Sequence, residues 1–198
     1  MNLCKQIALA AAALLATVGA QAAVVASGTF GNVGLQSPGA LSTTFNAPAG
    51  AASVEFQLDG FSSLDGDNFY IDVFTLSLNG TSVFSGTWDL GGGGADEVLL
   101  APSGATATFT SRQTLDVVVP LSLLAGSNTL TFAYDSPLSW QGIDRAGPQG
   151  PGDEGWGVGA YTVTAAVPEP APVALMLAGI GMVGGLARRR AKQLQAQG

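Results

Sequence analysis

The sequence predicts an all-β domain, a two-sheet sandwich of jelly-roll type, between an N-terminal signal peptide and a C-terminal transmembrane helix. Two observations predict the sandwich. Short apolar or alternating runs recur between residues 23 and 166, separated by Gly, Asn, Asp, Ser and Pro. No segment in this range has the apolar period of a helix. An apolar segment near each end of the chain predicts the flanking parts.

The first 22 residues have the composition of a secretory signal peptide. Lys5 supplies a positive n-region, an apolar run extends from Ile7 to Val18, and Ala20-Gln21-Ala22 matches an A-x-A cleavage site. We therefore expect a signal peptidase to cleave after Ala22. The single cysteine, Cys4, would leave with this peptide.

Nine segments between residues 23 and 166 have the pattern of β-strands. Val54, Phe56 and Leu58 alternate with polar neighbours, which predicts one buried and one solvated face. Asn79-Gly80 tolerates positive φ at both positions and lies between two such runs, so it predicts a type I′ hairpin. The expected strands are Val24–Phe30, Leu41–Asn46, Ser53–Leu58, Asp72–Leu78, Thr81–Trp88, Ala107–Arg112, Leu115–Val119, Asn128–Tyr134 and Gly159–Thr164.

Two connections between these strands have distinctive compositions. Gly91–Gly94 is followed by neither Lys nor a helix, so it predicts a flexible loop and not a phosphate loop. Pro120–Asn128 ends in a turn before the next strand, which fits the edge of a sandwich. The run Val119–Phe132 is similar to the late strands of galactose-binding-like domains.

The composition of the expected mature chain excludes several kinds of chemistry. Without Cys and His it has no disulfides, thiol nucleophiles, ordinary zinc sites or Ser-His-Asp triads. Residues 23–166 carry thirteen Asp or Glu and only two cations, Arg112 and Arg145. This balance argues against nucleic acid as a partner, permits divalent cations, and also serves solubility.

Two long loops contain acidic residues that predict a calcium site. Asp65-Gly66-Asp67-Asn68 resembles a fragment of a calcium loop, although Phe69 departs from the EF-hand pattern. Asp72 ends this first loop, and the second loop contains Asp153 and Glu154. The alternative is that the Asp-Gly pairs only form turns. The expected calcium ligands are Asp65, Asp67, Asp72, Asp153 and Glu154.

Tryptophans in the second loop predict a second kind of site. Trp140 and Trp156 could stack on sugar rings, and the alternative is that they belong to the core. Asp153-Glu154-Gly155-Trp156-Gly157 resembles a motif before the last strand of several secreted sandwich domains. A remote alternative is a glycosidase, in which a pair of carboxylates such as Asp65 with Asp153 would carry out the hydrolysis.

The last 32 residues have the arrangement of a membrane-targeting signal. Val167-Pro168-Glu169-Pro170 precedes 17 uncharged residues, 171–187, which as a helix would be about 25 Å long, the short end for a bilayer core. Arg188-Arg189-Arg190, with Lys192, follows at once and predicts a cytoplasmic C-terminus. The segment therefore predicts a membrane anchor with a basic stop.

Motif, spacing, Gly-rich span and Arg cluster together resemble the PEP-CTERM sorting signal of Gram-negative bacteria. The resemblance implies recognition by an exosortase, a membrane-embedded cysteine transpeptidase, and processing at the outer face of the inner membrane. It also implies a role in exopolysaccharide and biofilm matrix, which many members of the family serve.

The sequence thus predicts three parts: a signal peptide (1–22), a β-sandwich ectodomain (23–166) and a sorting signal (167–198). We expect an exported surface or matrix protein, not an enzyme, with an inner-membrane-anchored precursor. Signal peptidase and exosortase are the expected partners during export, and exopolysaccharide is the expected partner outside the cell. The rival class is a calcium-assisted, lectin-like carbohydrate-binding module.

Overall fold

The structure is a computed structural model of the 198-residue chain. It describes residues 21–31, 34–61, 64–68, 71–136, 155–167, 176–177, 179–185, 188–189 and 193. The contacts divide the chain into two units, residues 22–166 and the two chain ends, 1–21 with 167–198. Each unit is considered by itself below.

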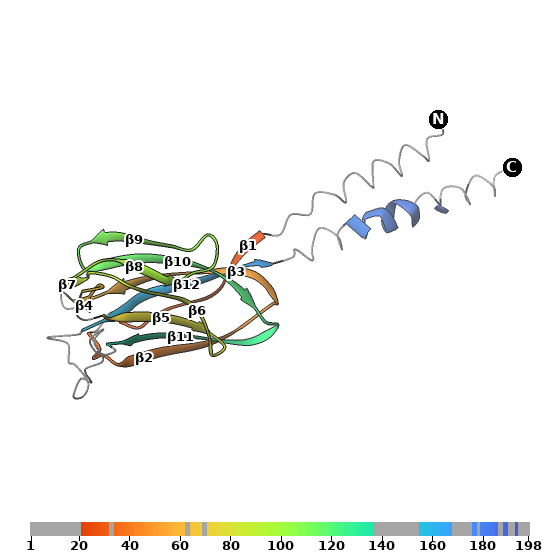
Figure 1. Ribbon diagram of the computed structural model, residues 1–198. Coiled ribbons are helices and arrows are strands. Elements are labelled where there is room, and N and C mark those ends of the chain that lie inside the picture. The colour runs from red at the N-terminus through yellow and green to blue at the C-terminus, as the bar shows by residue number, and fades with distance from the viewer. Residues whose placement is uncertain are drawn as a thin grey trace. The chain divides into compact units, whose positions relative to one another are not determined.

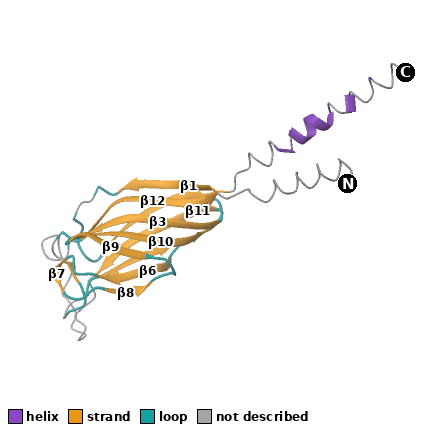
Figure 2. Cartoon of the chain, turned by 90° about the horizontal axis from the view of Figure 1, so that it is seen from above, coloured by secondary structure: helices purple, strands orange, loops and turns teal. Residues whose placement is uncertain are grey.

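Residues 22–166 form an all-β, two-sheet sandwich, as the sequence predicts. One sheet has the strand order β1-β12-β3-β10-β9 and the other the order β2-β11-β5-β6-β8 (Figures 1 and 2). A third, two-stranded sheet pairs β4 with β7. The strands are β1 (Gln21–Thr29), β2 (Gly39–Ala47), β3 (Gly50–Asp59), β4 (Leu64–Asp65), β5 (Val73–Leu78), β6 (Thr81–Thr87), β7 (Gly91–Gly93), β8 (Glu97–Leu100), β9 (Thr106–Ser111), β10 (Thr114–Leu123), β11 (Gly126–Asp135) and β12 (Gly157–Val167).

The core lies between the two large sheets and consists of the alternating apolar residues of their inner faces. Buried and half-buried positions alternate along β5 and β10, as the period of two predicts. Phe56 of β3 meets Phe132 of β11 across the sandwich, with ring centroids 5.1 Å apart and planes 77° apart. Such edge-to-face contacts add about 0.5–1.5 kcal/mol to the burial of the rings.

All nine expected strands are present, with ends that differ by a few residues. The type I′ hairpin is also confirmed, because Asn79 and Gly80 have φ of 53° and 81°. The Asn79 side chain explains its position: its Oδ1 accepts a hydrogen bond from the Thr129 backbone N–H at 2.8 Å. The turn is thereby tied to β11.

The stretch after Val119 differs from the expectation. It continues β10 to Leu123, so the strand does not end before Pro120. Pro120 pairs with Ser53 of β3, whereas the pairing with β9 ends at Val118. The pairing with β9 has already ended at this point, and prolines in sheets occur where a strand has a ladder partner on one side only.

The described part of the C-terminal tail is helical at residues 176–177 and 179–185. No helix among the described residues is long and apolar enough to cross a membrane. Of the expected span 171–187, residues 171–175, 178 and 186–187 lie outside the described residues. The transmembrane helix therefore stays a prediction.

Candidate functional site

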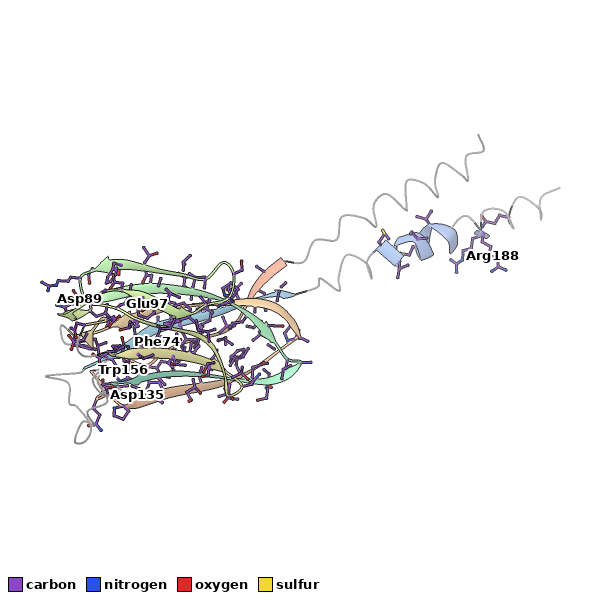
Figure 3. All side chains as sticks on the ribbon, viewed as in Figure 1. Phe74, Asp89, Glu97, Asp135, Trp156 and Arg188 are labelled. Carbon is purple, nitrogen blue, oxygen red and sulfur yellow. The ribbon has the colours of Figure 1, made fainter. Side chains whose placement is uncertain are left out.

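Described parts of the first long loop and the glycine run lie at one end of the sandwich, which we call the loop end (residues 59–61, 64–68, 89–96, 109–114 and 155–157). Asp59 of β3 pairs with Thr114 of β10 and with Gly157 of β12, so these three strand ends lie together. Figure 3 shows Asp89 and Trp156 toward the same end. The opposite end of the same sheet carries Ala52 of β3 and Ala165 of β12, two residues before β12 ends at Val167.

The glycine run is an ordered part of the loop end, so the prediction of a flexible loop is wrong. Gly91–Gly93 form β7, which pairs with β4 in parallel. Both the Gly91 and the Gly93 backbone N–H donate to Asp89 Oδ1 at 2.9 Å. A Cβ on Gly92 would lie 2.5 Å from Asp65 Oδ1 and 2.8 Å from the Leu64 carbonyl carbon. Glycine is therefore required for the close approach of the two strands.

The same segment clamps the first long loop. The Asp67 N–H donates to the Ala95 carbonyl at 2.7 Å, and the Ala95 N–H donates back at 2.9 Å. The Gly66 N–H donates to the Gly93 carbonyl at 2.7 Å. The 64–68 segment is thus held by backbone hydrogen bonds.

The acidic residues of this loop have mostly structural contacts. Asp72 is fully buried, and its Oδ2 accepts a hydrogen bond from the Asp65 N–H at 2.6 Å. Asp65 Oδ1 accepts one from Asn68 Nδ2 at 3.2 Å, whereas Asp67 is exposed. Among the described residues no three acidic side chains are grouped to hold a metal ion. The remaining expected ligands, Asp153 and Glu154, lie outside the described residues.

Trp156 belongs to the core, which corrects its expected role as a stacking platform. Its side chain is fully buried, its Nε1 donates to the Gln36 carbonyl at 3.0 Å, and its ring lies 5.6 Å from that of Tyr134. A ring without an exposed face cannot stack on a sugar from solution. Trp140, the other expected stacking residue, lies outside the described residues.

An open groove of about 440 Å³ lies at the loop end, between the segment after β6 and the end of β9. Its side chains include two carboxylates, Asp89 and Asp96, the Arg112 guanidinium, and Phe109, which is 41% exposed. Asp96 Oδ1 accepts a hydrogen bond from the Asp89 N–H at 2.9 Å. The groove is lined by Asp89, Gly94, Asp96, Phe109, Thr110, Ser111 and Arg112.

Sequence reasoning missed this groove. The alternation of Ala107 and Phe109 with threonines would place Phe109 on a buried face, but both sides of β9 are largely exposed. Asp89 and Asp96 match no motif, and they meet residues 109–112 only because β8 and β9 belong to opposite sheets. One feature of the sequence pointed to a groove residue: Arg112 is one of only two basic residues between residues 23 and 166.

The residues expected to direct export lie at the ends of the sandwich strands and in the tail. Val167 is the last residue of β12, and Ala22 is the second residue of β1. Arg188 and Arg189 are exposed. Ala20, Pro168, Glu169, Pro170 and Arg190 lie outside the described residues.

Several solved structures are similar to this chain at low sequence identity and low TM-score. A family 35 carbohydrate binding module from an environmental isolate is 12% identical, with a TM-score of 0.37, over 77% of this chain and 98% of that one. Infectious bursal disease virus VP2 is 12% identical, with a TM-score of 0.40, over 78% of this chain and 34% of that one. A Paenibacillus sp. cycloisomaltooligosaccharide glucanotransferase is 16% identical, with a TM-score of 0.34, over 73% of this chain and 17% of that one. The chain therefore spans less than a fifth of that enzyme. No curated protein sequence matches the chain.

The tail matches a known family model. Residues 166–191 match the PEP-CTERM protein-sorting motif, which confirms the resemblance seen in the sequence. The matched range contains Pro168-Glu169-Pro170, the apolar segment and the three arginines of the tail, Arg188-Arg189-Arg190. The match implies export, a membrane-anchored precursor and processing by an exosortase. Residues 166–191 of the chain therefore carry a PEP-CTERM protein-sorting motif.

Proposed function

We propose that the protein is a surface or extracellular matrix protein that its exosortase cuts close to Pro168–Pro170, leaving the sandwich outside the cell. The observation that carries the proposal is the sorting-motif match at 166–191, which begins within the last two residues of β12. The sorting signal thus follows the last strand directly. In a Gram-negative host the precursor would be held in the inner membrane, and the released form would join the exopolysaccharide of the biofilm matrix.

The distribution of the core supports cleavage at this point. Every buried hydrophobic residue of the core cluster lies between Val54 and Ala165. Removal of the chain after Pro170 would therefore take away none of the described core side chains. Signal-peptide removal after Ala22 would also leave the core intact, although it would shorten the edge strand β1 by two residues.

The buried position of Asp72 and the lack of His in the sequence favour a structural or binding role over an enzymatic one, although the groove does bring two carboxylates, Asp89 and Asp96, together. Glycoside hydrolysis needs two available carboxyl groups about 5–9.5 Å apart. The Asp72 carboxylate is buried against the backbone of Asp65, so it is not placed to reach a substrate. The chain has no His, and its single Cys belongs to the expected signal peptide. The lectin-like alternative is favoured by the groove at the loop end.

Cell fractionation of the natural host with and without its exosortase tests the proposal. An antibody against the sandwich should find the protein at the cell surface or in the medium of the complete strain. In the strain without exosortase the protein should stay with the inner membrane. An identical distribution in the two strains would contradict the proposal.

A further inference from the structure

The groove at the loop end has the composition of a ligand site, and neither the sorting motif nor the core accounts for it. Its volume of about 440 Å³ lies within the range of about 300–1,000 Å³ that is typical of small-ligand sites. Its lining is mainly polar, with five polar or charged side chains beside a single exposed aromatic ring. These features raise the question of which ligand chemistry it fits.

The two carboxylates are held in place through one oxygen each. Asp89 Oδ1 accepts from the Gly91 and Gly93 N–H groups, and Asp96 Oδ1 accepts from the Asp89 N–H. No described residue donates a hydrogen bond to the second oxygen of either group. Both second oxygens are therefore acceptors whose orientation is set before a ligand arrives, which lowers the entropy cost of binding.

The other side of the groove supplies a donor and an apolar surface. None of the five N–H donors of the Arg112 guanidinium is taken up by a described residue. Phe109 is 41% exposed at the edge strand β9, where an inward-facing aromatic would normally be covered. Thr110 and Ser111 add two hydroxyl groups to the lining.

We propose that this groove binds a neutral saccharide chain. Sugar hydroxyls donate to carboxylate oxygens and accept from a guanidinium, while the C–H face of the ring packs on an aromatic side chain. An acidic polysaccharide is disfavoured, because two carboxylates line the groove and residues 23–166 carry thirteen acidic residues against two arginines. A metal ion does not fit, since no three acidic groups converge among the described residues.

The groove lies at the end of the sheet opposite to the end of β12, where the sorting signal begins. Ser111 and Arg112 belong to the β9–β10 turn, at the end of the sheet opposite to Ala165 and Val167. The eight steps from Gly157 to Ala165 along β12 correspond to about 26 Å at 3.3 Å per residue. The groove is therefore far from the point where the sorting signal begins. The inference deepens the proposed matrix role, and its biological meaning rests on the proposed export.

The test measures binding of the purified full chain, in a detergent without sugar groups, to three polysaccharides. Dextran is the neutral probe, chitosan the cationic one and alginate the acidic one, and the host's own neutral exopolysaccharide is added to the panel. Affinity electrophoresis should show retardation by a neutral polysaccharide. Phe109→Ala and Asp96→Asn should each weaken that binding at least tenfold. The second substitution keeps a side-chain oxygen that can still accept from the Asp89 N–H, so the loop should stay folded.

Leu124→Ala is the matched control for Phe109→Ala, because Leu124 is also an exposed apolar residue but lies outside the groove. This control should bind like the unaltered chain. The proposal is overturned if no neutral polysaccharide binds, if both groove variants bind normally, or if only alginate is retained. Fractionation of the Phe109→Ala strain separates the two proposals: normal sorting without saccharide binding is the expected result. Failed sorting of the unaltered chain with intact binding would refute only the proposed export.

Discussion

At the scale of single residues, Trp156 shows how a residue expected at a binding surface stabilises the fold instead. Its backbone exchanges two hydrogen bonds with Leu35, at 2.6 and 3.0 Å, and its indole N–H donates to the Gln36 carbonyl. These contacts join the segment before β2 to the start of β12, more than a hundred residues later in the chain. The aromatic ring packs against Tyr134 of β11.

Trp156→Phe should lower the stability of the sandwich. Phenylalanine keeps an aromatic ring but cannot donate to the Gln36 carbonyl, and the loss of one hydrogen bond costs about 0.5–1.5 kcal/mol. The smaller ring would also leave space at a fully buried position, which adds to the loss. Urea unfolding followed by circular dichroism measures the loss as a lower midpoint. An unchanged midpoint would mean that the indole N–H is not needed in the native state.

The sequence could not decide the role of Trp156. Tryptophan is equally suited to a core and to a sugar platform, because it is large, flat and carries one polar group. The choice depends on whether the loop before it covers the ring, which is a matter of tertiary structure. By contrast, Asn79 and Gly80 were predictable, because their positive φ values follow from local backbone sterics.

At the scale of elements, the strands with clear alternation were predictable and the short ones were not. β4 has two residues, β7 consists of glycines, and β8 has four exposed residues, so none of them has a pattern of buried and solvated positions. β4 and β7 exist because two loops that are distant in the sequence pair with each other, Leu64 with Gly91 and Asp65 with Gly93. Only the assembled sandwich brings such segments together.

Gly92→Ala should destabilise the loop end. Its Cβ would lie under 3 Å from Leu64 and Asp65, and overpacking of this kind costs about 1–3 kcal/mol. Gly159→Ala is the control, because the atom nearest to its added Cβ would be Gln57 Oε1 at an ordinary 3.5 Å. Thermal unfolding should show a lower midpoint for the first variant and a nearly unchanged one for the second. Equal midpoints would contradict the close β4–β7 pairing.

β8 is an exposed apolar edge strand. Val98, Leu99 and Leu100 are 50%, 49% and 44% exposed, and β8 has a neighbour on one side only. Edges of this kind pair with other chains unless a charge blocks them. Leu99→Lys should therefore reduce concentration-dependent association in light scattering while changing stability by less than about 0.5 kcal/mol. More association in the lysine variant would refute this interpretation.

At the scale of the whole molecule, the tail was the part of the chain most fully predictable from its sequence. Its meaning depends on a linear order of motif, apolar segment and arginines, and the match at 166–191 confirms that order. The groove of the sandwich was not predictable, because Asp89 and Phe109 are brought together by the closure of two sheets. Linear signals can be read directly, whereas composite sites require the fold.

Neutralising the basic residues of the tail tests the expected orientation of the precursor. Replacing Arg188, Arg189, Arg190 and Lys192 by Gln removes the cations that resist translocation. In a strain without exosortase, some precursor of this variant should leave the inner membrane, and the unaltered precursor should not. Full retention of the variant would show that the apolar segment alone holds the chain.

The most direct test of the account is the intact mass of the protein released by the natural host. Processing by signal peptidase and exosortase predicts a species that starts at Ala23 and ends close to Pro168–Pro170, without residues 176–198. The strain without exosortase should yield only membrane-bound protein that retains the C-terminal segment. A released species that still ends at Gly198 in the complete strain would contradict the central claim.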